Sequence, residues 1–294
     1  MGRFLKRTLK VLKWVILVPI VLLIILNLAG CFQFRSSNEK SIRDFEKDSL
    51  TLRAGSYVAN GRDINYRSIN QGDEMPLVIY VHGSPGSSQD FFNTMKDSVM
   101  LAHYEMMCID RPGYGYSDFG NAEPDLDKQA QVLGPIIAEN KDRKIILIGH
   151  SYGGPVVARA AMLYNDMLHG CVVVAGSVSP ELEPNEKWRG PMHHPLLRWI
   201  FPKVFRVSND EILPLKEELT RILPDWSSIT IPMYVVQGEK DFLVPAGNAQ
   251  FIEKMCTNSR DVRLFMYPEE NHFIPFTKHE FIRDAVMEIM RNHP

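Results

Sequence analysis

Six short and almost entirely apolar runs constrain the fold of this chain more than any other feature. They lie at residues 76–81, 104–110, 144–149, 171–176, 232–238 and 262–268, and turn residues end them. Helical stretches separate most of the runs, including residues 125–140 and 278–291. Fully apolar strands that alternate with helices are typical of a mostly parallel sheet covered on both faces. Two alternating runs around Asn60-Gly61 predict a β-hairpin, which brings the expected sheet to eight strands.

Residues 179–228 interrupt this alternation of strands and helices. The segment contains many prolines and several short amphipathic pieces, and it lacks a strand-like run. A structureless loop of this length would be unusual inside a compact domain. We therefore expect a small helical insertion after the sixth strand of the sheet.

The stretch KIILIGHSYGGPVVARAAM, residues 144–162, joins a predicted strand to a predicted helix through a glycine-rich turn. Within it, Gly149, Ser151 and Gly153 fit the pattern G-x-S-x-G. So tight a turn needs glycine on both sides and holds the serine at its tip with the hydroxyl exposed. Ser151 is therefore the predicted nucleophile, and a glycine-serine turn without chemistry is the alternative.

A serine is a weak nucleophile until a base, itself oriented by a third group, takes its proton. His272, in YPEENHFIP, follows the last predicted strand, and Asp241, in VVQGEKDFLVP, follows the strand before it. Loops after parallel strands share the carboxyl edge of a sheet. We therefore predict a triad of Ser151, Asp241 and His272, with Glu181 and Glu183 as weaker candidates for the acid.

From about Tyr57 to its C-terminus the chain resembles an α/β-hydrolase. HGSPGSS at residues 82–88 resembles the family's His-Gly loop, and DRPGYGYS at residues 110–117 resembles its turn after the fourth strand. The resemblance implies an α/β-hydrolase core at residues 51–178 and 229–294. It also implies that the insertion at 179–228 is a cap that roofs the pocket.

The resemblance further implies an oxyanion hole made by the backbone N–H groups of Ser84 and Tyr152. It implies acyl transfer without a cofactor, in which His272 acts as base toward Ser151 and Asp241 orients the imidazole. The expected partner is a small-molecule ester or acyl substrate.

Two departures narrow the chemistry within this family. Dehalogenases and epoxide hydrolases of this fold carry aspartate where Ser151 stands, and proline iminopeptidases usually have a second glycine where Ser84 stands. The leading interpretation is therefore a serine hydrolase that cleaves a carboxylic ester through an acyl-enzyme. An amidase, peptidase or acyltransferase with the same triad is the alternative, and a non-catalytic binding module is a third hypothesis. The fold does not set the substrate.

The N-terminus is predicted to tether the protein to a membrane. Residues 1–13 carry five basic side chains and no acidic one, and residues 14–26 are apolar apart from one proline. LAGC, ending at Cys31, resembles the lipobox of bacterial lipoproteins, in which the cysteine is acylated. Residues 1–31 are therefore a lipoprotein signal or an uncleaved anchor. Both place the catalytic domain outside the cytoplasm, in a bacterial cell envelope, with residues 32–50 as a polar stalk.

Composition excludes several other classes. A formal net charge of -2 shows no basic bias toward nucleic acid. Four scattered cysteines are too few for a disulfide framework, so Cys108, Cys171 and Cys256 are expected to be free and buried. His193 and His194 lack an evident third ligand, so no metal site is expected. The oligomeric state stays open.

Overall fold

The computed structural model describes residues 2–28, 30, 32–70, 72, 75–184 and 186–294. Eight strands form one sheet in the order β1-β2-β4-β3-β5-β6-β7-β8. β1 and β2 pair antiparallel, as do β2 and β4, and the remaining neighbours are parallel. The predicted mostly parallel eight-stranded sheet is thus confirmed. The strands are β1 (Arg53–Ala59), β2 (Arg62–Ile69), β3 (Leu77–Val81), β4 (Glu105–Ile109), β5 (Ile145–His150), β6 (Gly170–Val174), β7 (Met233–Gly238) and β8 (Val262–Tyr267).

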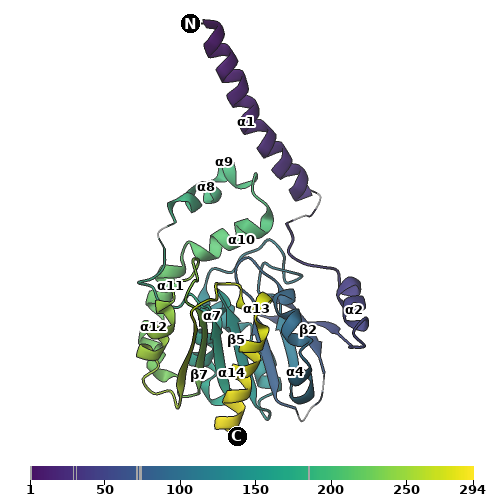
Figure 1. The fold of residues 1–294 in the computed structure, drawn as a ribbon, viewed down its shortest axis with the longest axis vertical. Coiled ribbons are helices and arrows are strands. Elements are labelled where there is room, and N and C mark those ends of the chain that lie inside the picture. The colour runs from purple at the N-terminus through teal and green to yellow at the C-terminus, as the bar shows by residue number, and fades with distance from the viewer. Residues whose placement is uncertain (1, 29, 31, 71, 73–74, 185) are drawn as a thin grey trace.

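Helices cover both faces of the sheet (Figure 1). One hydrophobic cluster joins it to α5, α6, α7 and α12, and a second joins its other face to α2, α3, α4, α13 and α14. The helices are α1 (Gly2–Leu28), α2 (Asn38–Glu46), α3 (Phe92–Met95), α4 (Ser98–His103), α5 (Leu126–Gln131), α6 (Gly134–Glu139), α7 (Gly153–Leu163), α8 (Gly190–His193), α9 (Pro195–Arg198), α10 (Lys203–Ile212), α11 (Leu215–Arg221), α12 (Gly247–Met255), α13 (Ile274–Thr277) and α14 (His279–Asn292).

The strands between the two clusters are apolar for a direct reason. Every residue of β3, β4, β5, β6 and β7 is buried, because helices pack on both sides of them. The predicted hairpin is also present: Asn60 and Gly61 both have positive φ, 52° and 72°, as the tight turn between β1 and β2 requires. Cys108, Cys171 and Cys256 are free and buried, as expected.

The predicted helix over residues 125–140 is divided into α5 and α6. Pro135 stands at the start of α6 and has no N–H to donate to the carbonyl of Gln131, where α5 ends. The predicted helical stretch is therefore present, and Pro135 accounts for its division into two helices.

The segment between β6 and β7 contains α8, α9, α10, α11 and 3₁₀ turns, and no strand occurs in its described residues. It lies over the end of the sheet where the parallel strands finish (Figure 1). The predicted helical cap after the sixth strand is therefore confirmed.

A buried ion pair attaches the cap to the core. The guanidinium of Arg111, just after β4, meets the carboxylate of Glu211 on α10 at 2.8 and 3.0 Å, and both side chains are 0% exposed. Tyr114 and Gln129 also donate hydrogen bonds to Glu211, at 2.5 and 3.1 Å. Although burial opposes the charge, the Glu211 carboxylate raises the pKa of Arg111. Arg111 therefore stays charged inside the protein.

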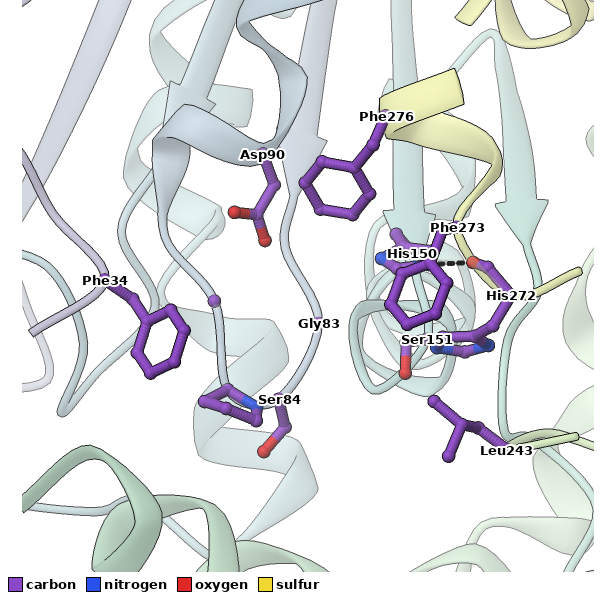
Figure 2. A pocket seen from close by; sticks show the side chains of 12 residues that line it. Phe34, Gly83, Ser84, Asp90, His150, Ser151, Leu243, His272, Phe273 and Phe276 are labelled. Atoms are coloured by element: carbon purple, nitrogen blue, oxygen red, sulfur yellow. Dashed lines mark hydrogen bonds between the residues drawn. The ribbon is translucent and has the colours of Figure 1, made fainter. Parts of the chain in front are cut away.

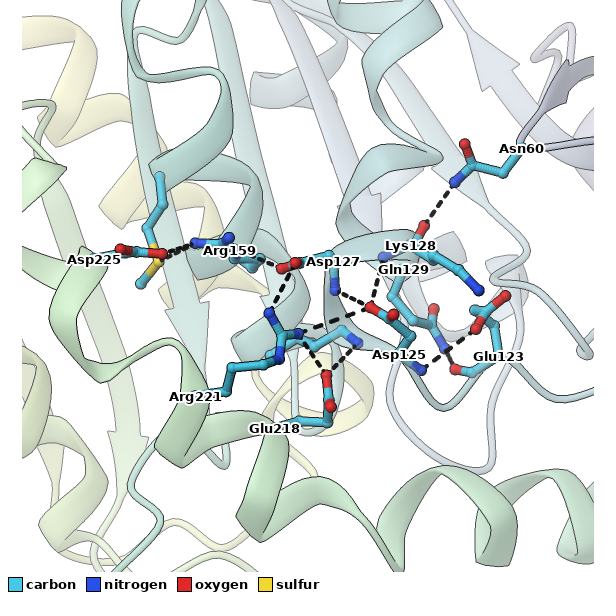
Figure 3. Close-up of polar contacts among 12 residues, drawn as sticks. Asn60, Glu123, Asp125, Asp127, Lys128, Gln129, Arg159, Glu218, Arg221 and Asp225 are labelled. Carbon is cyan, nitrogen blue, oxygen red and sulfur yellow. Dashed lines mark hydrogen bonds and ion pairs between the residues drawn. The ribbon is translucent and has the colours of Figure 1, made fainter.

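A second, more exposed network ties the cap to the core at its other side (Figure 3). Arg159 of α7 contacts Asp127 and Asp225, each at 2.5 Å, and Arg221 of α11 contacts Asp127 at 2.8 Å. Glu218 accepts from Arg221 and from the backbone N–H of Leu126. Solvent screens these pairs, so each contributes less than the buried one.

We expect Glu211→Ala to lower the free energy of unfolding by about 3–5 kcal/mol, because it leaves the Arg111 charge buried without its partner. Arg221→Ala, which breaks the exposed network, should lower it by no more than about 1 kcal/mol. Urea unfolding monitored by circular dichroism measures both. Equal losses in the two variants would contradict a dominant contribution from the buried pair.

The N-terminal helix α1 projects away from the rest of the molecule (Figure 1). Its residues 7–27 are long and apolar enough to cross a membrane. Twenty-one helical residues span about 31 Å, close to the hydrocarbon core of a bilayer. The predicted lipid attachment at Cys31 lies outside the described residues.

The segment predicted as a polar stalk, residues 32–50, does not stand free. It contains α2, whose first turn is capped by Ser37 and which buries Ser41 and Phe45. The Phe45 ring packs edge-on against Phe92 at 5.0 Å. The few apolar side chains of α2 therefore pack it against the core. The high charge of residues 32–50 gave no sign of this packing in the sequence.

Candidate active site

Ser151 lies at the turn between β5 and α7 with φ at 54°, in the left-handed region. The glycines on either side are required by close backbone contacts. A Cβ at Gly149 would lie 2.2 Å from the Gly153 carbonyl oxygen, and one at Gly153 would lie 2.2 Å from the Val81 carbonyl oxygen. Neither neighbour is a movable side-chain end, so only glycine fits the turn that presents Ser151.

Asp241 and His272 meet on the loops after β7 and β8. His272 Nδ1 lies 2.8 Å from Asp241 Oδ2, and the Asp241 side chain is 0% exposed. The other carboxylate oxygen accepts backbone N–H bonds from Leu243 and Val244 at 2.9 and 2.8 Å. Burial opposes the charge, but these hydrogen bonds, that of His272 foremost, lower the pKa of Asp241. An ionised Asp241 accepts a hydrogen bond from the Nδ1–H group, which leaves Nε2 of His272 as an acceptor.

Ser151 and His272 line the same two cavities. Figure 2 shows the serine hydroxyl beside the imidazole ring. The structure thus brings together the three residues that the sequence placed on three separate loops. Neither weaker acid candidate pairs with His272: Glu181 is exposed, and Glu183 accepts a hydrogen bond from Ser177.

The loop after β3 lies against the nucleophile. A Cβ at Gly83 would come within 2.9 Å of the Ser151 Cβ, so glycine permits this close approach. Ser84, the next residue, lines both cavities, and its hydroxyl makes 2.9 Å hydrogen bonds to Tyr114 and to Ser208 of the cap. Tyr152, directly after the nucleophile, is buried. The structure therefore gathers Ser84 and Tyr152 around Ser151.

Arg111 holds this loop in place, which the sequence did not reveal. Its Nε donates to the His82 carbonyl and its Nη2 to the Gly83 carbonyl, each at 2.8 Å. Its backbone N–H donates to His82 Nε2 at 2.9 Å, and its guanidinium lies 4.6 Å from the Tyr152 ring centroid. The DRPGYGYS motif, which contains Arg111, was the only signal in the sequence for this role. Glu211, which pairs with Arg111, lies in the cap outside any motif.

His150 supports the loop that carries the base. Its Nε2 lies 2.9 Å from the His272 carbonyl oxygen, and burial, with the neighbouring His272, lowers the pKa of His150 to about 3. A neutral imidazole that donates this bond fixes the backbone of His272. His150 directly precedes Ser151 in the sequence and contacts the backbone of His272, so it is a positioning residue.

Two cavities open at Ser151. The larger, about 440 Å³, is lined by Phe34, Gly83, Ser84, Pro85, Gly86, Asp90, His150, Ser151, Leu243, His272, Phe273 and Phe276 (Figure 2). The smaller, about 130 Å³, shares Ser151 and His272 and adds polar side chains such as Ser177, Glu183 and Arg189. A mainly apolar cavity and a smaller cavity with a larger polar share therefore meet at Ser151.

Asp90 places a carboxyl group in the wall of the apolar cavity. Burial raises the pKa of Asp90 to about 7, with Asp110 adding to the shift and a hydrogen bond from the Ser87 backbone opposing it.

Across the described residues, no group of three His, Cys, Asp or Glu side chains could hold a metal ion. His193 instead faces Asp210 at 3.5 Å.

Asp90→Asn should stabilise the protein at high pH and leave it unchanged at low pH. The raised pKa means that the Asp90 carboxyl ionises at a cost to the folded state, so stability falls as the pH rises from about 4 through 7. Asparagine stays neutral and still accepts the Ser87 N–H. We expect the melting temperatures of variant and wild type to coincide at pH 4 and to diverge above pH 7. A constant difference across this range would refute the assignment.

Comparisons with known proteins agree with this architecture. A family model for the alpha/beta hydrolase fold matches residues 76–206. Human serine hydrolase BPHL is 25% identical over 247 residues, which cover 76% of this chain and 81% of that protein. Proteins named as proline iminopeptidases are also among the relatives.

Solved structures show the same fold. A Burkholderia cenocepacia protein assigned as an aryl esterase superposes with a TM-score of 0.66 at 19% identity, covering 82% of this chain and 99% of its own. A membrane phospholipase A described as a bacterial virulence factor superposes with a TM-score of 0.64 at 16% identity, covering 99% of both chains. Esterase and lipase structures are thus among those that this chain resembles.

Proposed function

Since the chain has an α/β-hydrolase fold, we propose that it is a serine hydrolase that cleaves a carboxylic ester through an acyl-enzyme intermediate. The observation that carries this proposal is the hydrogen bond between Asp241 and His272 at the rim of the cavity that exposes Ser151. Three loops after three different strands supply these groups. A hydroxyl, an imidazole and a buried carboxylate in series form the apparatus of acyl transfer.

Attack on the ester begins with a proton transfer. His272 Nε2 takes the proton of Ser151 as its Oγ forms a bond to the carbonyl carbon, and Asp241 stabilises the resulting imidazolium. The negative charge moves to the carbonyl oxygen. Backbone N–H groups of Ser84 and Tyr152 are the proposed donors to that oxygen. Arg111 holds the loop that carries Ser84 through its hydrogen bond to the Gly83 carbonyl.

Collapse of the tetrahedral intermediate expels the alcohol, which leaves with a proton from His272. Water then enters and gives a proton to His272 as it attacks the carbonyl carbon of the acyl-enzyme. The bond between that carbon and Ser151 Oγ breaks, His272 returns the proton to Oγ, and the acid is released. The larger cavity is suited to the acyl chain because its wall is mainly apolar, and the smaller one is suited to a polar leaving group.

Ser151→Ala should lower kcat for p-nitrophenyl butanoate by at least about 10⁴-fold, because no other group can form the acyl-enzyme. Asp241→Asn should also lower it strongly, by about 10⁴-fold, since the amide no longer fixes the productive tautomer. Circular dichroism should show both variants folded. Undiminished turnover by the alanine variant would end the proposal.

A fluorophosphonate probe separates the remaining alternatives. Labelling of wild type but not of Ser151→Ala supports a reactive nucleophile, and failure to label the folded protein favours a binding module. A panel of matched ester, thioester and amide substrates, with and without an added alcohol, then distinguishes an esterase from an amidase, a peptidase or an acyltransferase. Faster cleavage of the amide than of the ester would contradict the esterase proposal and favour an amidase or peptidase.

We further propose that the protein is tethered to a membrane of a bacterial cell envelope with its catalytic domain outside the cytoplasm. Support comes from the apolar length of α1 and from the basic residues in its N-terminal half. The tether is either α1 itself or a lipid on Cys31, and the LAGC sequence supports the second.

Intact mass spectrometry of the protein extracted from membranes decides between the two tethers. Removal of residues 1–30 with a diacylglycerol-sized addition at Cys31 is expected from the lipobox resemblance. A mass that includes residues 1–30 would instead establish α1 as the anchor. Recovery of the protein in the soluble fraction without either feature would contradict tethering.

A further inference from the structure

The wall of the apolar cavity is completed by a residue from outside the hydrolase core. Phe34 lines this cavity together with Ser151 and His272, although it belongs to the segment between α1 and α2. It follows the last residue of α1, Leu28, by six positions. Figure 2 shows its ring across the cavity from Ser151, so the membrane-proximal segment reaches the substrate space.

The backbone at Phe34 is held in an unusual conformation. Its φ is 50°, in the left-handed region that a bulky side chain rarely adopts. Such a conformation persists only where surrounding contacts determine it. The segment is therefore fitted against the body of the protein rather than loosely attached.

Contacts on both sides of Phe34 supply this constraint. Its ring packs edge-on against Phe205 of α10 at 5.9 Å, and Phe32 packs against the same ring at 5.8 Å. The guanidinium of Arg35 donates to the Gly115 carbonyl and lies 4.3 Å from the Tyr116 ring centroid. The cap and the loop after β4 together place the Phe34 ring.

The position of this ring defines what the cavity can hold. Pro85, Leu243, Phe273 and Phe276 make the rest of the wall largely apolar. Such a wall suits the hydrocarbon chain of an acyl group whose carbonyl carbon is bonded to Ser151 Oγ. Phe34 is 47% exposed and lines the cavity opposite Ser151. An acyl chain that extends from Ser151 across the cavity therefore reaches this ring.

We infer that Phe34 determines the length of acyl chain that the enzyme accepts, so that specificity depends on the segment next to the membrane anchor. This inference rests on the proposed function. It assigns the substrate class as esters of apolar acyl chains. It also means that a protein shortened beyond residue 34 lacks part of its substrate site.

The test compares full-length Phe34→Ala, Phe34→Trp and Phe32→Ala in detergent on p-nitrophenyl esters from acetyl to dodecanoyl. Alanine opens the end of the cavity, and each further methylene buried is worth about fourfold in kcat/KM. We expect Phe34→Ala to raise the decanoyl-to-hexanoyl ratio of kcat/KM by about tenfold. Tryptophan should lower the same ratio.

Phe32→Ala is the matched control, because Phe32 contacts the same Phe205 ring but does not line the cavity. Its ratio should stay within about twofold of wild type, the error of comparing closely related variants. Equal shifts in the Phe32 and Phe34 variants, or no shift in the Phe34 pair, would overturn the inference. Loss of fluorophosphonate labelling in the wild type would instead refute the proposed function, so the two failures are distinguishable.

Discussion

The buried pair of Arg111 and Glu211 is the interaction on which the site depends. Two charges without solvent exposure are tolerated only where each finds several hydrogen-bond partners. Arg111 meets this condition by binding the carbonyls of His82 and Gly83, and Glu211 by accepting from Tyr114 and Gln129. Satisfying the charges therefore also fixes the loop beside Ser151. The Arg111–Glu211 pair thus both attaches the cap and fixes the loop at His82 and Gly83.

Helix α10 extends this coupling to the segment that follows α1. The same short helix carries Glu211, Ser208 next to Ser84, and Phe205 next to Phe34. The cap is thus more than a roof, because it joins the loop beside the nucleophile to the segment that leads to α1. A change of substrate range in such a protein could arise from α10 without any change in the three residues at the catalytic edge.

The sheet and most of its elements could be predicted because burial on both faces leaves a visible pattern of apolar runs. The residues of the proposed triad could be predicted for a related reason: each ends a strand, and the ends of parallel strands share one edge. Two details were not predicted. Pro135 divides the helical stretch at residues 125–140 into α5 and α6, and α2 packs on the core through Phe45, although the composition of residues 32–50 favoured a polar stalk.

By itself the sequence determined the α/β architecture, the glycine-bounded turn at Ser151 and the order in which the reactive side chains follow one another. These are local properties, set by periodicity and by backbone conformations that few residues adopt. Only the tertiary structure decided that Glu211 pairs with Arg111, that Asp90 lies in a mainly apolar wall and that Phe34 lines the cavity. These partners are separated by long stretches of chain, and pairing at such distances depends on packing, which leaves no periodic signal in the sequence.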